Sequence, residues 1–78
     1  MTTAAARTEY RRLRSEYLAG VRTLRAQMGR YARGGEYTAR DFDREVARGL
    51  RLCDGITSPT PEQWVDGARH ALAHWRAS

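Results

Sequence analysis

Residues 7–33 read RTEYRRLRSEYLAGVRTLRAQMGRYAR, and this stretch decides the fold expected for the chain. Its large apolar side chains recur every three or four residues, at Tyr10, Leu13, Tyr17, Val21, Leu24, Met28 and Tyr31. That interval matches one face of an α-helix, because a half-buried strand would place apolar residues at every second position. No proline interrupts the stretch. The pattern therefore predicts a long amphipathic helix over residues 7–33, with the residues before Arg7 frayed and Thr2 or Thr3 as a candidate N-cap.

Arginine side chains gather along one flank of this predicted helix, beside its apolar face. Projection at about 3.6 residues per turn places seven residues there, which we call the arginine flank: Arg7, Arg11, Arg14, Leu18, Arg22, Arg25 and Arg33. Glu9 and Glu16 fall on the opposite flank. The helix is thus expected to have an apolar face, a basic side and a small acidic side.

Two interpretations of the arginine flank are open. It is either a solvated face, whose arginine stems cover apolar surface while the charged heads stay in water, or a docking surface for phosphates or carboxylates, which suit the planar guanidinium. A solubilising face more often mixes charges of both signs within one turn of a helix. The scarcity of carboxylates on this flank favours the docking surface, to which Leu18 would add apolar contact.

The length and composition predict a single domain, residues 1–78, with a thin core. Only eleven of the 78 residues are Leu, Ile, Val or Phe, although two Trp and four Tyr add apolar surface. A chain of this length buries only about 60–65% of the surface that its unfolded state exposes. Small domains of this kind often depend on a partner or on self-association, so a homodimer is among the expected states.

The net charge of +5 is concentrated in the first part of the chain. Residues 1–33 contain eight Arg and two Glu. Such an excess of positive charge favours acidic partners, nucleic acid above all. No apolar run approaches the roughly 18 residues of a membrane span, and the opening MTTAAARTEY lacks the apolar core of a secretory signal. We therefore expect a cytoplasmic protein with no membrane contact.

Two shorter helices are predicted downstream, over residues 39–54 and 61–76. Thr38 and Asp41 have the spacing of a capping box at the start of the first of these. Residues 60–63, TPEQ, supply an N-cap threonine, a proline at the first helical position and a glutamine for a second capping box. Three amphipathic helices with short connections predict an all-α fold, a small antiparallel three-helix bundle with a long N-terminal helix.

The helix over residues 39–54 is expected to place Cys53, the single cysteine, on its apolar face as a small core residue. A lone cysteine also excludes a disulfide within the chain. Four arginines fall on the opposite face: Arg40, Arg44, Arg48 and Arg51. Because Asp41 and Glu45 are near neighbours of these arginines, we expect a solvated face whose charges pair with each other.

No pattern in the sequence indicates catalysis. It contains no phosphate-binding glycine loop and no serine nucleophile elbow, so we expect a non-enzymatic protein without a cofactor. Asp66, His70 and His74 are four residues apart, but the glutamate of the zinc-protease helix is missing, and we interpret them as a solvated face rather than a metal site. The connection before the last helix, residues 55–60, is longer than the turn of about 3–4 residues in a DNA-reading helix-turn-helix. We therefore exclude a standard helix-turn-helix motif.

These observations lead to one main hypothesis, one principal alternative and a weaker third option, which is a metal-dependent module built on His70 and His74. The main hypothesis is a small helical protein that binds an acidic partner through the arginine flank. Nucleic-acid backbone is the preferred partner, and an acidic protein surface is the second choice. The alternative is a protein–protein interaction module, such as a phage- or mobile-element-encoded inhibitor of a host complex. The alternative would depend more on exposed apolar side chains than on charge.

Overall fold

The computed structural model describes the chain at residues 2–28 and 37–77, with side chains described at residues 2–21 and 37–76. Three α-helices make up these parts of the chain: α1 (Thr3–Met28), α2 (Ala39–Asp54) and α3 (Pro61–Ala77). The described ranges contain no strand, and the predicted all-α fold of three helices with a long first helix is confirmed. Every described helix is either too short or too polar to cross a membrane.

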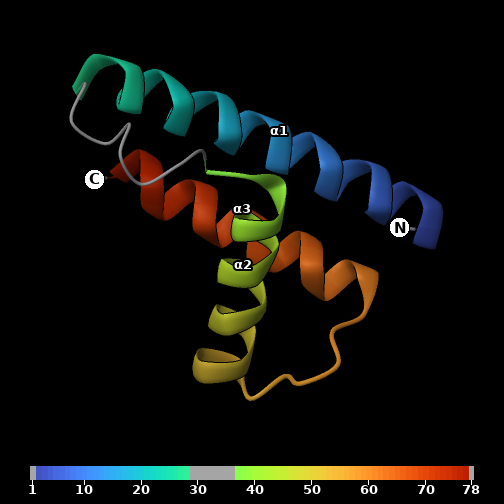
Figure 1. Ribbon diagram of the computed structural model, residues 1–78. Helices are drawn as coiled ribbons and strands as arrows, with labels where there is room; N and C mark the ends of the chain where they lie inside the picture. The colour runs from blue at the N-terminus through green and yellow to red at the C-terminus, as the bar shows by residue number, and fades with distance from the viewer. Residues whose placement is uncertain (1, 29–36, 78) are drawn as a thin grey trace.

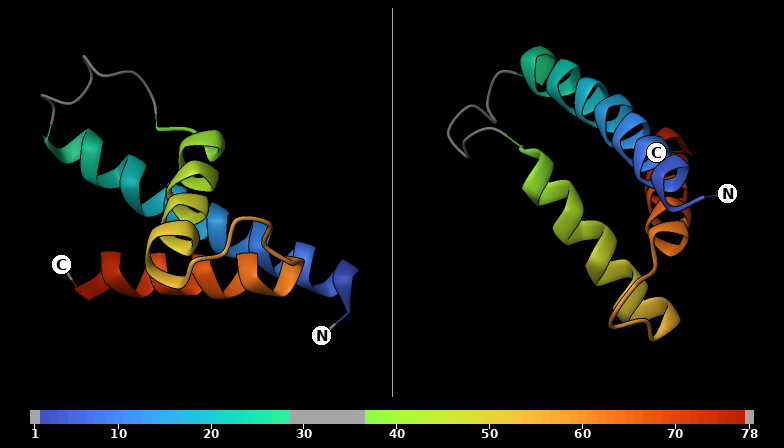
Figure 2. Two further views of the ribbon diagram at one scale, coloured as in Figure 1. Left: turned by 90° about the horizontal axis from the view of Figure 1, so that it is seen from below. Right: turned by 90° about the vertical axis from the view of Figure 1, so that its right-hand side faces the viewer.

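The helices α1 and α3 form the principal pair. They lie side by side and run in the same direction, while α2 crosses both at a steep angle instead of lying alongside them (Figure 1 and Figure 2). The connection after α2 brings the chain back to the N-terminal end of α1, so that α3 begins beside the first turns of α1. This arrangement brings residues from both ends of the sequence together.

The first helix starts earlier than the sequence pattern predicts. Thr2 serves as its N-cap, since its Oγ1 accepts a hydrogen bond of 3.1 Å from the backbone N–H of Ala5. Ala6 is completely buried, so packing holds the first turn in place and the prediction of fraying before Arg7 is wrong. The predicted end of this helix, residues 29–33, lies outside the described residues.

The other two helices begin where their capping residues predict. Thr38 Oγ1 accepts from the Asp41 N–H at 3.4 Å, and Asp41 Oδ2 accepts from the Thr38 N–H at 2.7 Å. The same reciprocal pair joins Thr60 and Gln63, at 3.2 Å and 2.9 Å. Gly55 ends α2 in the left-handed region, with φ of 68°, which glycine adopts without steric cost.

The core lies where the three helices meet, around Phe42 of α2. Phe42 is fully buried, and its ring lies 4.8 Å from that of Tyr17 on α1 and 5.9 Å from that of Tyr10. Gly67 allows α3 to approach α2 closely, since a Cβ atom at this position would lie 2.7 Å from Val46 Cγ1. The core is compact but small, as the composition predicts.

Cys53 is exposed, and the prediction that it belongs to the core is wrong. It lies near the end of α2 beside Leu52, whose exposed fraction is 66%. The last buried residue of α2 is Leu50, because α2 crosses its neighbours and its final turn extends past them. The apolar pattern of the sequence continues one turn beyond the part of the helix that is covered.

A candidate arginine-lined groove

A groove with a volume of about 630 Å³ runs between the first turns of α1 and the start of α3. Three arginines of the predicted flank line one side of it: Arg7, Arg11 and Arg14. The apolar part of the lining, which we call the apolar wall, comes from the start of α3 and the residues just before it, with Pro59, Pro61 and Trp64. Tyr10 of α1 and Asp43 of α2 complete the lining. The groove thus combines cationic side chains from one helix with flat apolar side chains from another.

Arg14 is held in place by contacts within the protein. Its Nη1 donates to both carboxylate oxygens of Asp43, at 3.2 Å and 3.1 Å, and its guanidinium lies 5.7 Å from the centre of the Tyr10 ring. Arg14 is also half-buried. One charge that the sequence assigns to a free basic surface is therefore neutralised by a carboxylate of α2 and stabilises the contact between α1 and α2.

Tyr10 connects the groove to the core. Its Oη donates a hydrogen bond of 2.5 Å to Asp43 Oδ1, and its ring meets that of Trp64 edge-on, with 5.6 Å between centroids and an interplanar angle of 75°. Burial, followed by the hydrogen bond to Asp43, raises the pKa of Tyr10 well above its usual value. The phenol therefore stays neutral and fixes the position of Trp64 in the wall of the groove.

Arg7 and Arg11 differ from Arg14. Both side chains are exposed, and neither forms an ion pair with any residue that the structure describes. They lie one helical turn apart, about 6 Å along the axis of α1. These two guanidinium groups at the edge of the groove are available to an anionic ligand.

Leu18 does not belong to the surface that the sequence predicts. Its exposed fraction is 9%, so it is a buried side chain and offers no apolar contact to a partner. The buried face of α1 is therefore wider at this point than the helical projection indicates, and it interrupts the arginine flank after Arg14. The side chains of Arg22 and Arg25, and the whole of Arg33, lie outside the described residues.

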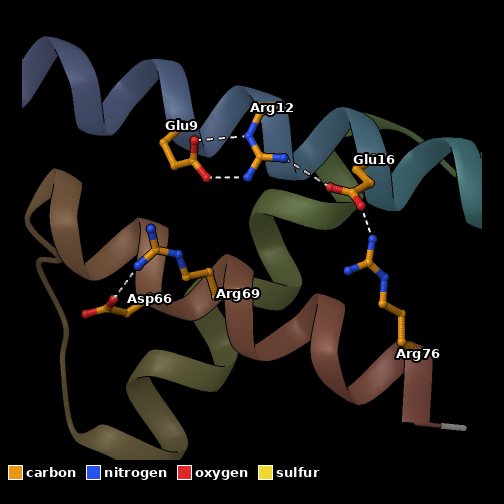
Figure 3. Close-up of polar contacts among 6 residues, drawn as sticks. All are labelled: Glu9, Arg12, Glu16, Asp66, Arg69 and Arg76. Carbon is orange, nitrogen blue, oxygen red and sulfur yellow. Dashed lines mark hydrogen bonds and ion pairs between the residues drawn. The ribbon is translucent and has the colours of Figure 1, made fainter.

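Glu9 and Glu16 lie on one side of α1, as predicted, but Arg12 lies between them, and a chain of ion pairs on this side joins α1 to α3 (Figure 3). Arg12 donates to Glu9 at 2.5 Å and to Glu16 at 3.3 Å, and Arg76 of α3 also pairs with Glu16. The hydrogen bond from Arg12 lowers the pKa of the Glu9 carboxyl below its usual value. These side chains neutralise one another, so this side of α1 presents little net charge to a partner.

The arginines on the outer face of α2 are exposed, as predicted, but among the residues that the structure describes no ion pair joins them to Asp41 or Glu45. Those arginines are Arg40, Arg44, Arg48 and Arg51. Asp41 caps Thr38, and Glu45 accepts hydrogen bonds from the hydroxyls of Tyr37 and Tyr17. The two carboxylates are thus engaged elsewhere. This second basic face is not among the residues that line the groove, and it provides a matched control for experiments on it.

The histidines of α3 are both exposed. His70 lines a second, smaller groove of about 320 Å³ between α2 and α3, together with Cys53 and Asp66. Within the described parts of the chain, no three His, Cys, Asp or Glu side chains come close enough to hold a metal ion. The structure therefore does not assemble a ligand set from the Asp66, His70 and His74 column.

No local pattern in the sequence predicts the apolar wall of the groove. Pro59, Pro61 and Trp64 are about 50 residues from the arginines in the same lining, and only the position of α3 brings the two sets together. Comparison with protein-family models, curated proteins and solved structures finds no significant match to this chain. Its function must therefore be inferred from its own residues.

Proposed function

We propose that this protein is a small non-enzymatic helical protein that binds nucleic-acid backbone through Arg7 and Arg11 at the edge of the groove. The observation that supports this proposal is a contrast between arginines of the same molecule. Arg12, Arg14 and Arg76 each contact a carboxylate of this chain, whereas Arg7 and Arg11 have no such partner among the described residues.

Phosphate is an anion that these side chains suit well. The planar guanidinium offers several N–H donors and binds phosphate oxygens with two hydrogen bonds at once. Three arginines and one carboxylate line the groove, so its local charge is positive, like the net charge of +5 of the whole chain. A positive surface of this kind also attracts a polyanion over a distance and accelerates its association.

A matched pair of double variants tests the proposal. Arg7→Gln with Arg11→Gln removes two charges at the groove, and Arg44→Gln with Arg48→Gln removes two exposed charges on the outer face of α2. Both lower the net charge equally. Affinity for a labelled oligonucleotide, measured by fluorescence anisotropy over a series of salt concentrations, should fall much further for the groove variant than for the α2 variant.

The salt dependence of the affinity gives a second readout. Each phosphate contact contributes about −0.7 to −0.9 to the slope of log K against log salt concentration. Loss of Arg7 and Arg11 should therefore make the slope shallower by about 1.5. Equal effects of the two double variants would show that overall charge, not the groove, determines binding. No binding of oligonucleotide by the wild-type protein would reject the proposal in favour of an acidic protein partner.

A further inference from the structure

The groove has a feature that phosphate binding alone does not require, namely its apolar wall. Pro59, Pro61 and Trp64 line the same groove as the arginines, with a volume of about 630 Å³, which lies within the range of roughly 300–1,000 Å³ for small-molecule sites. Binding to the phosphates along a nucleic-acid duplex requires only cationic side chains on the protein surface. A concave site with flat apolar side chains opposite the cations fits a ligand that is anionic at one side and flat and apolar at the other.

Trp64 is the aromatic side chain best placed to contact such a ligand. The ring of Tyr10 is already surrounded by Phe42, Trp64 and the guanidinium of Arg14. Trp64 is half-buried and packs against the core from its edge, and among the described aromatic residues its ring pairs with Tyr10 alone. The same indole lines the groove together with Pro59 and Pro61.

We infer that the groove binds single-stranded nucleic acid, with an unpaired base against Trp64 and the neighbouring phosphates on Arg7 and Arg11. This inference rests on the proposed function and adds a preference for one form of nucleic acid. Every base has a face that can stack on an aromatic ring, and such stacking tolerates any sequence. A duplex keeps its base faces inside the helix, so it reaches the arginines but not Trp64.

An acidic peptide matches the groove less well. Its carboxylates suit Arg7 and Arg11, but acidic side chains have no flat face to place against Trp64 and the two prolines. Each nucleotide of a single strand carries an anionic phosphate and a flat base. The groove offers arginines for the phosphates and Trp64 with two prolines for the base. Charge complementarity and the aromatic wall together favour the nucleic acid.

The experiment compares a short oligothymidylate with a duplex of the same length. The wild-type protein should bind the single strand at least about 10-fold more tightly at equal salt, since one stacked base is worth about this factor. Trp64→Leu, which keeps apolar volume but removes the ring, should lose about 10-fold for the single strand and leave duplex affinity unchanged. Trp64→Phe retains a ring and should recover most of the lost affinity.

Fluorescence of the wild-type protein gives a test that needs no variant. Stacking of a base on Trp64 should quench tryptophan emission on addition of oligothymidylate, and the duplex should not. The inference is overturned if single strand and duplex bind equally without quenching, or if a poly-glutamate peptide binds the groove as tightly as oligothymidylate. If the duplex still binds through Arg7 and Arg11 in that case, the proposed function stands. If neither nucleic acid binds, both proposals fail.

Discussion

Replacing Gly67 with alanine should destabilise the protein, whereas the same substitution at Gly49 should stabilise it. Both glycines lie inside helices, Gly67 in α3 and Gly49 in α2. In a helix interior, alanine is favoured over glycine by about 1 kcal/mol, because glycine loses more conformational freedom on folding. Helix propensity alone therefore predicts stabilisation at both positions, and a difference between the two variants must come from packing.

The surroundings of the two glycines differ. A Cβ atom at Gly67 would lie 2.7 Å from Val46 Cγ1 and 3.3 Å from Leu50 Cγ, whereas one at Gly49 would meet no atom within 4 Å. Favourable carbon–carbon contacts are about 3.5–4.0 Å. Val46 is β-branched, with few rotamers available to it, and it is 3% exposed. The methyl group at Gly67 can therefore be accommodated only if α2 and α3 move apart.

The expected magnitudes follow from these two effects. Overpacking a core costs about 1–3 kcal/mol, so Gly67→Ala should lower the free energy of unfolding by about 1 kcal/mol after the gain of about 1 kcal/mol in helix propensity. Gly49→Ala should raise it by up to about 1 kcal/mol. In a domain of this size, a change of 1 kcal/mol moves the melting temperature by about 4–8 °C.

Thermal and urea denaturation, followed by helical circular dichroism, would measure both variants against the wild type. The two melting temperatures should lie on opposite sides of the wild-type value. If Gly67→Ala is as stable as Gly49→Ala, then α2 and α3 are not in close contact at Gly67, and the packing of the two helices described above is wrong.

Three further predictions concern the tyrosines, a helix cap and the core. Because the pKa values of Tyr10 and Tyr37 are raised by burial and by hydrogen bonds to carboxylates, the contribution of these two tyrosines to the free energy of unfolding should be constant below about pH 10 and decrease above it; Tyr10→Phe should reduce this loss of stability at high pH, as measured by urea denaturation at stepped pH. Thr60→Ala removes the hydroxyl that accepts from the Gln63 N–H and should lower the free energy of unfolding, measured by urea denaturation, by about 1 kcal/mol. An unchanged free energy of unfolding would show that the cap contributes nothing. Phe42→Ala removes a fully buried aromatic ring and should lower the free energy of unfolding by about 3–5 kcal/mol, which is most of the stability of a small domain. Cooperative unfolding at the wild-type temperature would contradict the assignment of Phe42 to the core.

Local signals predicted the helices well. The starts of α2 and α3 follow from Thr38, Asp41, Thr60 and Gln63, because a capping box is complete within four residues and needs no tertiary contact. The existence of α1 follows from the spacing of its apolar side chains for the same reason. At the start of α1, Thr2 is an N-cap candidate from its residue type alone, but the order of the first turn could not be predicted, since the burial of Ala6 depends on helices that lie much later in the sequence.

The candidate site could be predicted only in part. A helical projection gives the direction of each side chain around the helix axis, and it correctly placed Arg7, Arg11 and Arg14 on one side of α1. It cannot show what covers that side, so it missed the burial of Leu18. The carboxylate of Asp43 that neutralises Arg14 comes from another helix, and no local pattern indicates it.

The apolar wall of the groove could not be predicted from the sequence for a related reason. Trp64 fits the apolar face of α3 as a core residue, and its spacing is the same whether the ring is covered or lines a groove. The parallel arrangement of α1 and α3, with the start of α3 beside the first turns of α1, brings Trp64 into the same groove as the arginines. That arrangement depends on contacts among all three helices.

The indole N–H signals of the protein provide the most direct test of the groove as the binding site. The chain has two tryptophans, Trp64 in the groove and Trp75, whose indole lies against Gly20 of α1. In a two-dimensional NMR titration with oligothymidylate, the Trp64 indole signal should shift with the amide signals of Arg7 and Arg11, while the Trp75 indole stays in place. Shifts confined to the arginines of α2, with the Trp64 indole unchanged at saturating oligothymidylate, would contradict the account.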